Sequence, residues 1–402
     1  MIVIIKKDQT VEPFNIQKVI TAVNKSANRV LYTFAENEIE DICNRVEGYI
    51  DDHHMTEIQI GEMHNIVEAA LEAVRPEVAK SYRDYRNYKQ DFVGMLDSVY
   101  KKSQAIMYIG DKENSNTDSA LVSTKRSLIF NQLNKELYQK FFMNTEEMQA
   151  CRDGYIYVHD MSARRDTMNC CLFDAANVLK GGFEMGNLWY NEPKTLNVAF
   201  DVIGDIVLSA ASQQYGGFTV PSVDLLLEPY AERSYKMLTE KYTRLGLDAD
   251  AVEKEVMADI RNDFEQGFQG WEYKFNTVGS SRGDYPFITM TFGTGRGRFA
   301  RLASITMLNV RRYGQGRKGH KKPVLFPKIV FLYDENLHGP GKPLEDVFDA
   351  GIECSAHAMY PDWLSLTGEG YVPSMYKKYG AIISPMGCRA FLSPWYERGG
   401  MK

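Results

Sequence analysis

The stretch Ser384–Leu392, with the sequence SPMGCRAFL, places one cysteine, Cys388, directly after a glycine. Gly387 has no side chain, so the backbone beside this cysteine can approach another segment closely. Two further stretches with polar or sulfur-bearing side chains precede it, GYIYVHD at 154–160 and MNCC at 168–171. The six cysteines form no C-x-x-C pair, and a chain of this length needs no disulfide framework. We therefore expect reduced thiols and no metal site within these residues.

The overall composition favours a globular protein with more than one domain. The 402 residues suggest two or three domains, and 44% hydrophobic with 25% charged residues is typical of soluble proteins. A net charge of −6 argues against a general affinity for nucleic acid, which would need a basic excess. No apolar run reaches the length of a membrane span, and the five apolar residues at the N-terminus are too few for a signal peptide. We predict a cytoplasmic protein with no nucleic-acid or membrane partner.

The first 92 residues are predicted to form a mostly helical domain that begins with a pair of short strands. Residues 2–5 and 11–14 have the pattern of a strand and a return strand. Asn15 is a favourable N-cap, and apolar residues at helical spacing follow it. Thr56–Gln59, with the sequence TEIQ, predicts a capping box that opens a later helix, and Pro76 suits the first position of another.

From residue 93 onward, long helical patterns alternate with short strand-like runs. Pro286–Phe292 and Val324–Leu332 are two such runs, and their alternation with helices predicts an α/β barrel or a sheet covered by helices. Two glycine-rich basic segments occur at 293–298 and 314–322. Either could hold a phosphate, but we interpret both as solvated loops.

The N-terminal sequence IIKKDQTVEPFNIQK resembles the ATP-cone, a regulatory module of many ribonucleotide reductases. The matching residues are Lys6, Glu12, Asn15 and Lys18, and Lys89 ends a tyrosine-rich run where that family has a further phosphate contact. Lysines and a helix N-terminus supply the charge-assisted hydrogen bonds that a triphosphate needs. A glutamate can accept from ribose hydroxyls or from an adenine amino group. The resemblance implies that residues 1–92 bind ATP or dATP; a small helical domain with solvated lysines is the alternative.

Five stretches in order along residues 93–402 resemble the catalytic domain of anaerobic (class III) ribonucleoside-triphosphate reductases. They are the three quoted above together with SQQYGG at 212–217 and MYPD at 359–362. The resemblance implies part of a ten-stranded α/β barrel of the glycyl-radical and ribonucleotide reductase type. In that family the cysteine of the MGCR motif becomes a thiyl radical on a loop inside the barrel.

By this resemblance Cys388 abstracts the 3′ hydrogen of the substrate ribose. A second cysteine on the first barrel strand delivers a hydrogen while the 2′ hydroxyl leaves as water, and the family places it after an asparagine, which selects Cys170. Adjacent strand residues point to opposite faces, so Cys170 and Cys171 cannot both face the barrel interior. His159 is the further candidate: it either positions formate or substrate, or has a purely structural role.

The resemblance also implies cofactors and partners beyond these residues. The glycyl-radical motif and the four-cysteine zinc site of the family are absent from the 402 residues, so we expect this portion alone to be inactive. We expect formate as the reductant, ATP and dATP as allosteric effectors, and ribonucleoside triphosphates as substrates for DNA precursor synthesis. A radical S-adenosylmethionine activating enzyme and a homodimer or higher homo-oligomer complete the expectation.

Two alternatives remain at this stage. One is a different glycyl-radical enzyme, an acyltransferase or lyase, but those lack an N-terminal cone and carry their cysteine pair at the loop tip. The other is a non-enzymatic nucleotide-sensing regulator that uses the same cone. Such regulators have a zinc ribbon and a basic DNA-binding face, and this sequence has neither a C-x-x-C pair nor a basic excess.

Overall fold

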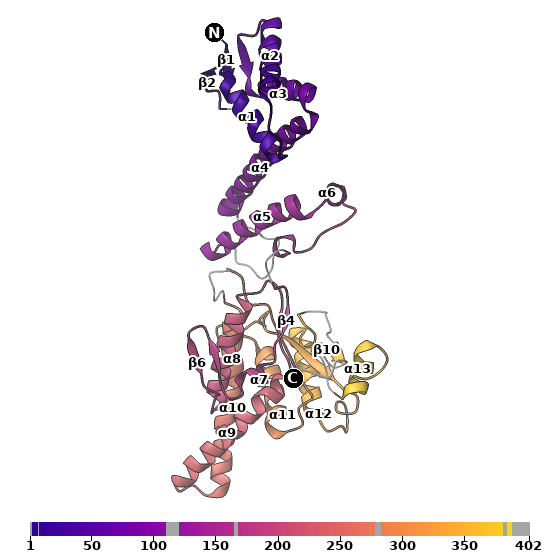
Figure 1. Cartoon of the computed structure of the whole chain (residues 1–402). Helices are drawn as coiled ribbons and strands as arrows, with labels where there is room; N and C mark the ends of the chain where they lie inside the picture. The colour runs from indigo at the N-terminus through magenta and orange to yellow at the C-terminus, as the bar shows by residue number, and fades with distance from the viewer. Residues whose placement is uncertain are drawn as a thin grey trace. The chain divides into compact units, whose positions relative to one another are not determined.

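The computed structural model describes residues 2–6, 8–109, 120–164, 168–277, 283–380 and 384–387. The chain divides into two compact units, Met1–Lys101 and Lys102–Lys402. This division lies inside the long helix α4 (Pro76–Ile109), which Figure 1 labels. The boundary predicted after residue 92 lies slightly earlier on the same helix and stays a prediction.

The first unit combines a small sheet with helices. Its strands are β1 (Val3–Ile5), β2 (Val11–Pro13) and β3 (Glu57–Gln59), and its helices before α4 are α1 (Ile16–Arg29), α2 (Glu36–Asp52) and α3 (Ile60–Val74). The central strand β1 pairs antiparallel with β2 and parallel with β3. Apolar side chains at helical spacing, among them Val23, Val46 and Leu71, form its buried core.

Of the two helix starts predicted at Asn15 and at Thr56–Gln59, the structure confirms the first and not the second. The Asn15 side chain accepts a hydrogen bond from the Gln17 N–H and caps α1, as predicted. The capping box predicted at Thr56–Gln59 is wrong, because Glu57–Gln59 forms β3 and α3 begins only at Ile60. Pairing with β1 explains the difference: it uses the backbone of this segment and buries the side chain of Ile58 completely.

The second unit begins with helices and continues as alternating strands and helices. Its helices are α5 (Val122–Phe142), α6 (Thr145–Arg152), α7 (Ala175–Leu179), α8 (Leu196–Ala211), α9 (Val223–Arg244), α10 (Ala249–Phe275), α11 (Arg298–Tyr313), α12 (Glu345–Ala358) and α13 (Tyr371–Tyr379), with a short 3-10 turn η1 (Met161–Ala163). Its strands are β4 (Cys171–Leu172), β5 (Phe183–Met185), β6 (Leu188–Tyr190), β7 (Phe218–Val220), β8 (Ile288–Phe292), β9 (Lys328–Tyr333) and β10 (Asp362–Ser365).

A parallel sheet forms the centre of this unit. Within the described residues its strand order is β10-β9-β8-β7-β4, and every neighbouring pair is parallel. Strands β5 and β6 form a separate antiparallel hairpin. Parallel neighbours require crossover connections, and α8 to α12 lie on those connections. The predicted α/β class is confirmed, and the structure adds that the sheet is parallel; the described residues form five of its strands and not a closed barrel.

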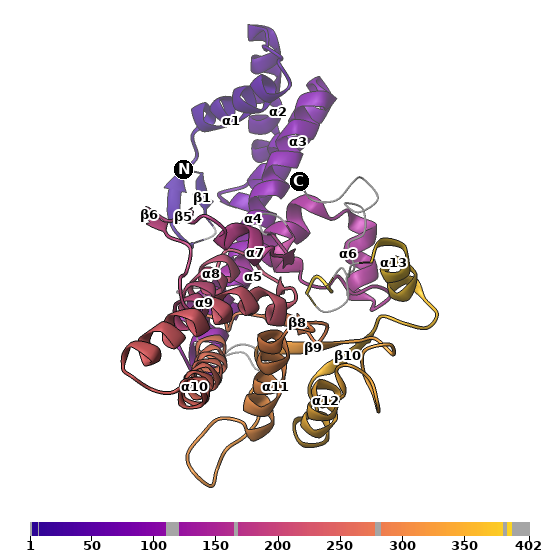
Figure 2. The ribbon, with the colours of Figure 1, turned by 90° about the horizontal axis from the view of Figure 1, so that it is seen from below.

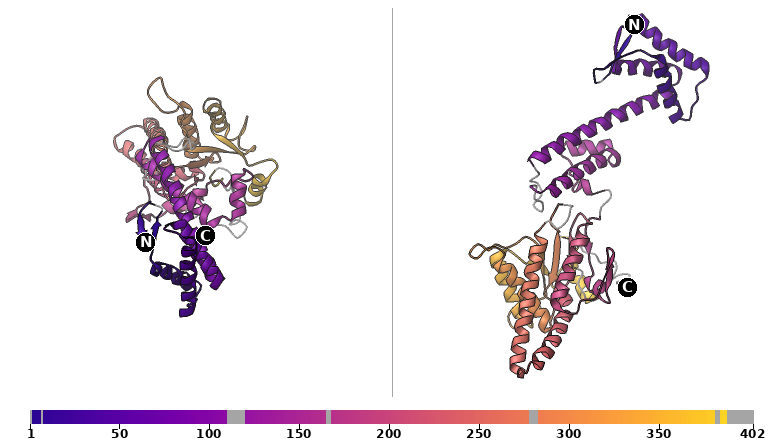
Figure 3. Two further views of the ribbon diagram at one scale, coloured as in Figure 1. Left: turned by 90° about the horizontal axis from the view of Figure 1, so that it is seen from above. Right: turned by 90° about the vertical axis from the view of Figure 1, so that its left-hand side faces the viewer.

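Helices cover one face of the sheet. In Figure 2, α10, α11 and α12 lie on the same side of β8, β9 and β10. The right-hand view of Figure 3 shows α9 and α10 as a long pair that extends past the ends of the strands. The core between these helices and the sheet contains an aromatic cluster of Phe200, Phe264, Phe268 and Trp271, and the Trp271 indole N–H donates to the Phe200 carbonyl at 2.8 Å.

The strand predicted over Val324–Leu332 begins later, at Lys328. The side chain of Asn276, at the end of α10, provides the reason. Its amide nitrogen donates to the Phe326 carbonyl at 2.5 Å, and its oxygen accepts from the Phe326 N–H at 3.1 Å. These two bonds replace the sheet pairing that the backbone of Phe326 would otherwise need.

Candidate functional site

The two adjacent cysteines lie on opposite faces of the sheet. Cys171 is the first residue of β4, is paired in register with Phe218, and packs against the core beneath the helices. Burial raises the pKa of the Cys171 thiol to about 11. Cys170 precedes the strand, and its sulfur accepts a hydrogen bond from the Gly217 N–H at 3.2 Å. The helix-covered face therefore holds Cys171, and Cys170 belongs to the other face.

The face opposite the helices carries a row of threonine hydroxyls. Thr219 of β7 and Thr289 of β8 are paired in register, and Thr291 lies two residues further along β8. All three side chains are completely buried. Because side chains alternate along a strand, their apolar neighbours Val220 and Met290 point toward the helices. This polar face is the part of the sheet that can meet a polar loop.

The segment Ser384–Gly387 lies against this row of hydroxyls. The Gly387 N–H donates to the Thr219 Oγ1 at 3.0 Å, and the Thr289 hydroxyl donates to the Gly387 carbonyl at 3.3 Å. The Thr291 and Ser384 hydroxyls are 2.7 Å apart and share a hydrogen bond. The loop that leads into Cys388 is thus bound to the centre of the sheet. Cys388 itself lies outside the described residues.

Close backbone packing at this point requires glycine. A Cβ atom on Gly217 would lie 2.6 Å from the Gly387 Cα, and one on Gly216 would lie 2.6 Å from the Cys170 sulfur. Gly387 has a φ of +65°, in the left-handed region, and a Cβ there would lie 3.0 Å from the same sulfur. The Cys170 sulfur therefore lies directly beside the residue that precedes Cys388.

A polar cluster lies near the beginning of β4 and β7. The His159 Nδ1 and an Asp160 carboxylate oxygen are 2.6 Å apart, and the Tyr215 hydroxyl donates to the other Asp160 oxygen at 3.1 Å. The Tyr215 N–H bonds the Met168 carbonyl at 2.9 Å, which ties the segment 212–217 to the segment before Cys170. The His159 side chain is 75% exposed, so its imidazole is open to solvent on this side.

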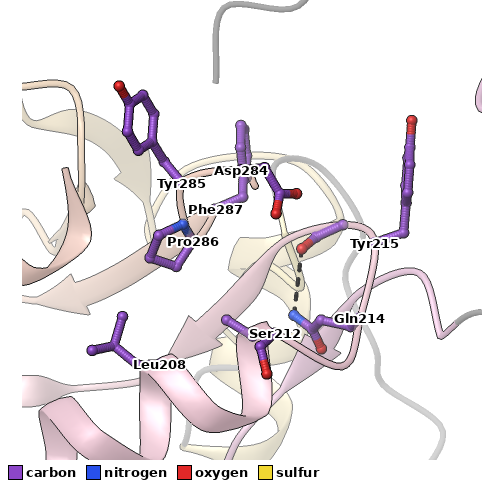
Figure 4. Close-up of a pocket in the computed structure, with 10 residues that line it drawn as sticks. Leu208, Ser212, Gln214, Tyr215, Asp284, Tyr285, Pro286 and Phe287 are labelled. Atoms are coloured by element: carbon purple, nitrogen blue, oxygen red, sulfur yellow. Dashed lines mark hydrogen bonds between the residues drawn. The ribbon is translucent and has the colours of Figure 1, made fainter. Parts of the chain in front are cut away.

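Figure 4 shows the small cavity next to this cluster, between the end of α8, the segment 212–217 and residues 284–287. Its volume is about 20 Å³, which suits a single water molecule. The Gln214 amide reaches across its edge and donates to the Gly216 carbonyl at 3.4 Å (Figure 4). This cavity is far too small for a nucleotide, so the candidate site for a substrate is the surface beside Cys170 and Gly387, next to the His159–Asp160–Tyr215 cluster.

The cone residues are partly brought together. Glu12 binds both predicted lysines, with one carboxylate oxygen 2.7 Å from the Lys6 Nζ and 2.8 Å from the Lys18 Nζ. The hydrogen bonds from Lys18 and Lys6 hold the pKa of Glu12 below its usual value. Asn15 lies between them in sequence and uses its side chain as the α1 cap. Lys89 on α4 is exposed and, within the described residues, shares no hydrogen bond or ion pair with this group.

The two glycine-rich segments differ from each other. The expectation of a solvated loop is wrong for Gly293 and Gly295, because both are buried and their N–H groups donate to the Asp224 carboxylate at 3.0 Å. Those amides are therefore not available to a phosphate. The segment 314–322 is closed by two backbone bonds between Gln315 and Lys322, and residues 316–322 are exposed, as predicted.

Sequence reasoning missed the threonine row and the role of Tyr215. A signal was present: FTV at 218–220 and ITMTF at 288–292 place threonine at every second position of otherwise apolar strands. A polar residue with the period of a strand inside an apolar run predicts a polar contact on one face.

The described residues contain no group of three or more His, Cys, Asp or Glu side chains that could hold a metal ion. In the same part of the chain, we find no helix with the length and apolar character of a membrane span.

The chain matches known families along most of its length. The family model described as anaerobic ribonucleoside-triphosphate reductase matches residues 113–402, and the ATP cone domain matches residues 2–91. Two curated proteins named anaerobic ribonucleoside-triphosphate reductase are similar. That of Haemophilus influenzae is 32% identical over 98% of this chain and 56% of the relative. That of Escherichia coli is 29% identical over 99% of this chain and 55% of the relative.

Among solved structures, the anaerobic ribonucleotide reductase from Thermotoga maritima with MES in the active site is similar at 15% identity, with a TM-score of 0.45 over 73% of this chain and 51% of that chain. The chain spans a little over half the length of the two curated relatives. Because a family model covers residues 113–402, the chain belongs to the anaerobic ribonucleoside-triphosphate reductase family, with an ATP cone domain at its front.

Proposed function

We propose that the protein reduces ribonucleoside triphosphates to deoxyribonucleoside triphosphates by thiyl-radical chemistry, for DNA precursor synthesis without oxygen. The observation that carries the proposal is the position of the Cys170 sulfur beside Gly387, the residue bonded to Cys388. The reaction needs two thiols close to the substrate ribose. One must take a hydrogen from the ribose and the other must give one.

Each cysteine has one role in the proposed reaction. A glycyl radical, on a residue outside this sequence, would take the hydrogen atom of the Cys388 thiol and leave a thiyl radical there. The Cys388 sulfur takes the 3′ hydrogen of the ribose, and Cys170 delivers a hydrogen as the 2′ hydroxyl is protonated and leaves as water. The 3′ hydrogen then returns from Cys388 to the sugar. Formate supplies the two electrons of the reduction, leaves as carbon dioxide and restores the hydrogen that Cys170 gave; with one proton from solvent, the sum is ribonucleotide plus formate to deoxyribonucleotide, carbon dioxide and water.

His159 is proposed to position formate or substrate at the candidate site. Its imidazole is exposed, and the Asp160 carboxylate holds the Nδ1 at 2.6 Å, so the Nε2 is left to meet a ligand. Tyr215 in turn holds Asp160 through its hydroxyl. The Tyr215 N–H also bonds the Met168 carbonyl, two residues before Cys170. Hydrogen bonds through Asp160 and Tyr215 therefore link His159 to the segment that carries this cysteine.

The cone is proposed to bind ATP as an activator and dATP as an inhibitor. Lys6 and Lys18 are the phosphate contacts, with Asn15 at the start of α1, Glu12 on ribose or adenine, and Lys89 as a further contact. The arrangement that supports this is the shared carboxylate of Glu12, which keeps two ammonium groups side by side next to a helix N-terminus. If dATP bound the cone and left turnover unchanged, the regulatory part of the proposal would be wrong.

The family also motivates the architecture and partners that we propose. The five parallel strands would be the first half of a ten-stranded barrel, with the Ser384–Gly387 segment on its inner face. We further propose a radical S-adenosylmethionine activating enzyme as partner, a zinc site in a glycyl-radical region outside this sequence, a homodimer or higher oligomer, and a cytoplasmic location.

The test is anaerobic turnover by the protein that carries this chain together with a glycyl-radical region. After activation, we expect formate-dependent conversion of a ribonucleoside triphosphate to its deoxy form. Cys170→Ala should lower the rate by at least about 10³-fold, because an essential hydrogen donor is lost. Cys171→Ala is the matched control and should keep most of the activity, since its thiol packs in the core. Loss of activity only in the Cys171 variant would contradict the assignment.

A further inference from the structure

The buried threonines of β7 and β8 have no role in the reaction described above. Thr219, Thr289 and Thr291 interrupt strands whose other residues are apolar, and each side chain is completely buried. A hydroxyl buried without a hydrogen bond would destabilise the fold. All three hydroxyls are bonded to the segment Ser384–Gly387, and Thr291 also accepts from the Ser222 N–H at 2.9 Å.

The backbone N–H and carbonyl of Gly387 are both hydrogen-bonded to threonine side chains of the sheet. The Gly387 N–H is fixed by Thr219 and its carbonyl by Thr289, from two neighbouring strands. The absence of side chains on Gly217 and Gly387 lets the two backbones meet, because a Cβ on Gly217 would clash with the Gly387 Cα at 2.6 Å. Thr291 adds a third attachment at Ser384. The peptide at Gly387 is therefore held by two hydrogen bonds and by close backbone contact with Gly217.

We propose that Thr219 and Thr289 are positioning residues, which hold the Gly387 peptide so that the neighbouring Cys388 meets the ribose on the Cys170 side. This inference rests on the proposed function. Hydrogen transfer depends steeply on the distance between the reacting atoms, so a misplacement of about 1 Å can cost on the order of 100-fold in rate. A thiol on a loop needs such support, and the two hydroxyls supply it from rigid strands.

The first test uses the chain as it is and measures amide hydrogen exchange at Gly387 by mass spectrometry or NMR. Thr219→Val keeps the shape of the side chain and removes the acceptor of the Gly387 N–H, so exchange should become about tenfold faster. Thr219→Ser keeps the hydroxyl and should restore slow exchange. Thr124→Val is the matched control: Thr124 is buried and bonds the Gly283 carbonyl, away from this loop.

The second test measures turnover in the protein that carries a glycyl-radical region. We expect Thr219→Val to lower kcat about tenfold or more at unchanged KM and unchanged glycyl-radical yield by electron paramagnetic resonance, with Thr219→Ser restoring kcat. Unchanged exchange at Gly387, or equal acceleration by Thr124→Val, would overturn the proposed clamp. Faster exchange with unchanged kcat would overturn its positioning role. Absence of turnover in the parent protein would count against the proposed function and leave the exchange result standing.

Discussion

Adjacent residues in this protein have opposite environments. Cys170 and Cys171 are chemically identical, yet one sulfur lies beside Gly387 and the other lies in the core beneath the helices. The same contrast separates Thr289 from Met290 on β8. The alternation of a strand accounts for both cases, because successive side chains point to opposite faces. The chemistry of each residue follows from the face on which it lies.

Asp224 is a buried acid whose protonation should make stability depend on pH. Its side chain is fully buried, one oxygen accepts from the Gly293 and Gly295 N–H groups, and the other has no hydrogen-bond partner among the described residues. Burial raises the pKa of Asp224, and the backbone hydrogen bonds oppose this effect. The folded state therefore binds the proton more tightly than the unfolded state does.

Because the folded state binds the Asp224 proton more tightly, the free energy of unfolding should fall as the pH rises. As pH rises above the ordinary aspartate value of about 4, the unfolded chain ionises first and becomes favoured, so stability falls until the folded pKa is passed. Asp224→Asn cannot ionise and should lose this slope. We expect the melting temperature of the parent, relative to the variant, to decrease between pH 4 and pH 7. A difference that stays constant across this range would show that Asp224 does not titrate in this way.

Buried polar groups also join whole elements of the second unit. Arg311 of α11 donates to Glu272 of α10 at 2.8 Å and to the Pro327 carbonyl, just before β9, at 2.7 Å. The side chains are 1% and 5% exposed, and Gln315 donates to the second oxygen of Glu272 at 2.6 Å. This network ties two helices of the covering layer to the beginning of a strand.

Breaking this network should destabilise the second unit strongly. Glu272→Ala leaves the Arg311 charge buried without a carboxylate, with only the Pro327 carbonyl as a hydrogen-bond partner in this network, and we expect a loss of about 3–5 kcal/mol in the free energy of unfolding. The control is Glu353→Ala on α12, which removes an exposed ion pair with Arg312 on the same helix α11 and should cost about 1 kcal/mol or less. Urea unfolding of both variants measures the difference. Equal effects would mean that burial does not decide the strength of these pairs.

At the scale of the whole molecule, the chain consists of two units with separate hydrophobic cores. Since each core is built from residues of one unit, we expect two unfolding transitions in calorimetry. A ligand that binds only the cone should raise only the transition of the first unit. A single transition that shifts as a whole would contradict the expectation that the units unfold separately.

Calorimetry with ATP tests whether a ligand of the cone stabilises the first unit alone. At a concentration of 100 times Kd, ATP should stabilise the first unit by about 2.7 kcal/mol and leave the second transition in place. Lys18→Ala should abolish most of this shift, because it removes one of the two ammonium groups held by Glu12. Lys25→Ala is the matched control, an exposed lysine on the same helix α1. An equal loss in both variants would point to general electrostatic attraction and not to a site.

The sequence by itself determined the features that depend on neighbours along the chain. The cap at Asn15, the helical spacing of the cone and the α/β class all follow from local patterns. Where a local pattern competed with a distant partner, the distant partner prevailed. The TEIQ segment became a strand because β1 was available to pair with it.

Only the tertiary structure decided which residues meet at the candidate site. The bond between Gly387 and Thr219 joins residues 168 positions apart, and the bond between Gly387 and Thr289 spans 98 positions. The conformational preferences of neighbouring residues carry no information on such distant pairs. The pairs depend on the order of the strands in the sheet and on which face of the sheet the helices cover. The orientation of Cys170 toward this loop, and of Cys171 toward the core, depends on the same choice: the helices cover one face of the sheet and leave the threonine face to the loop.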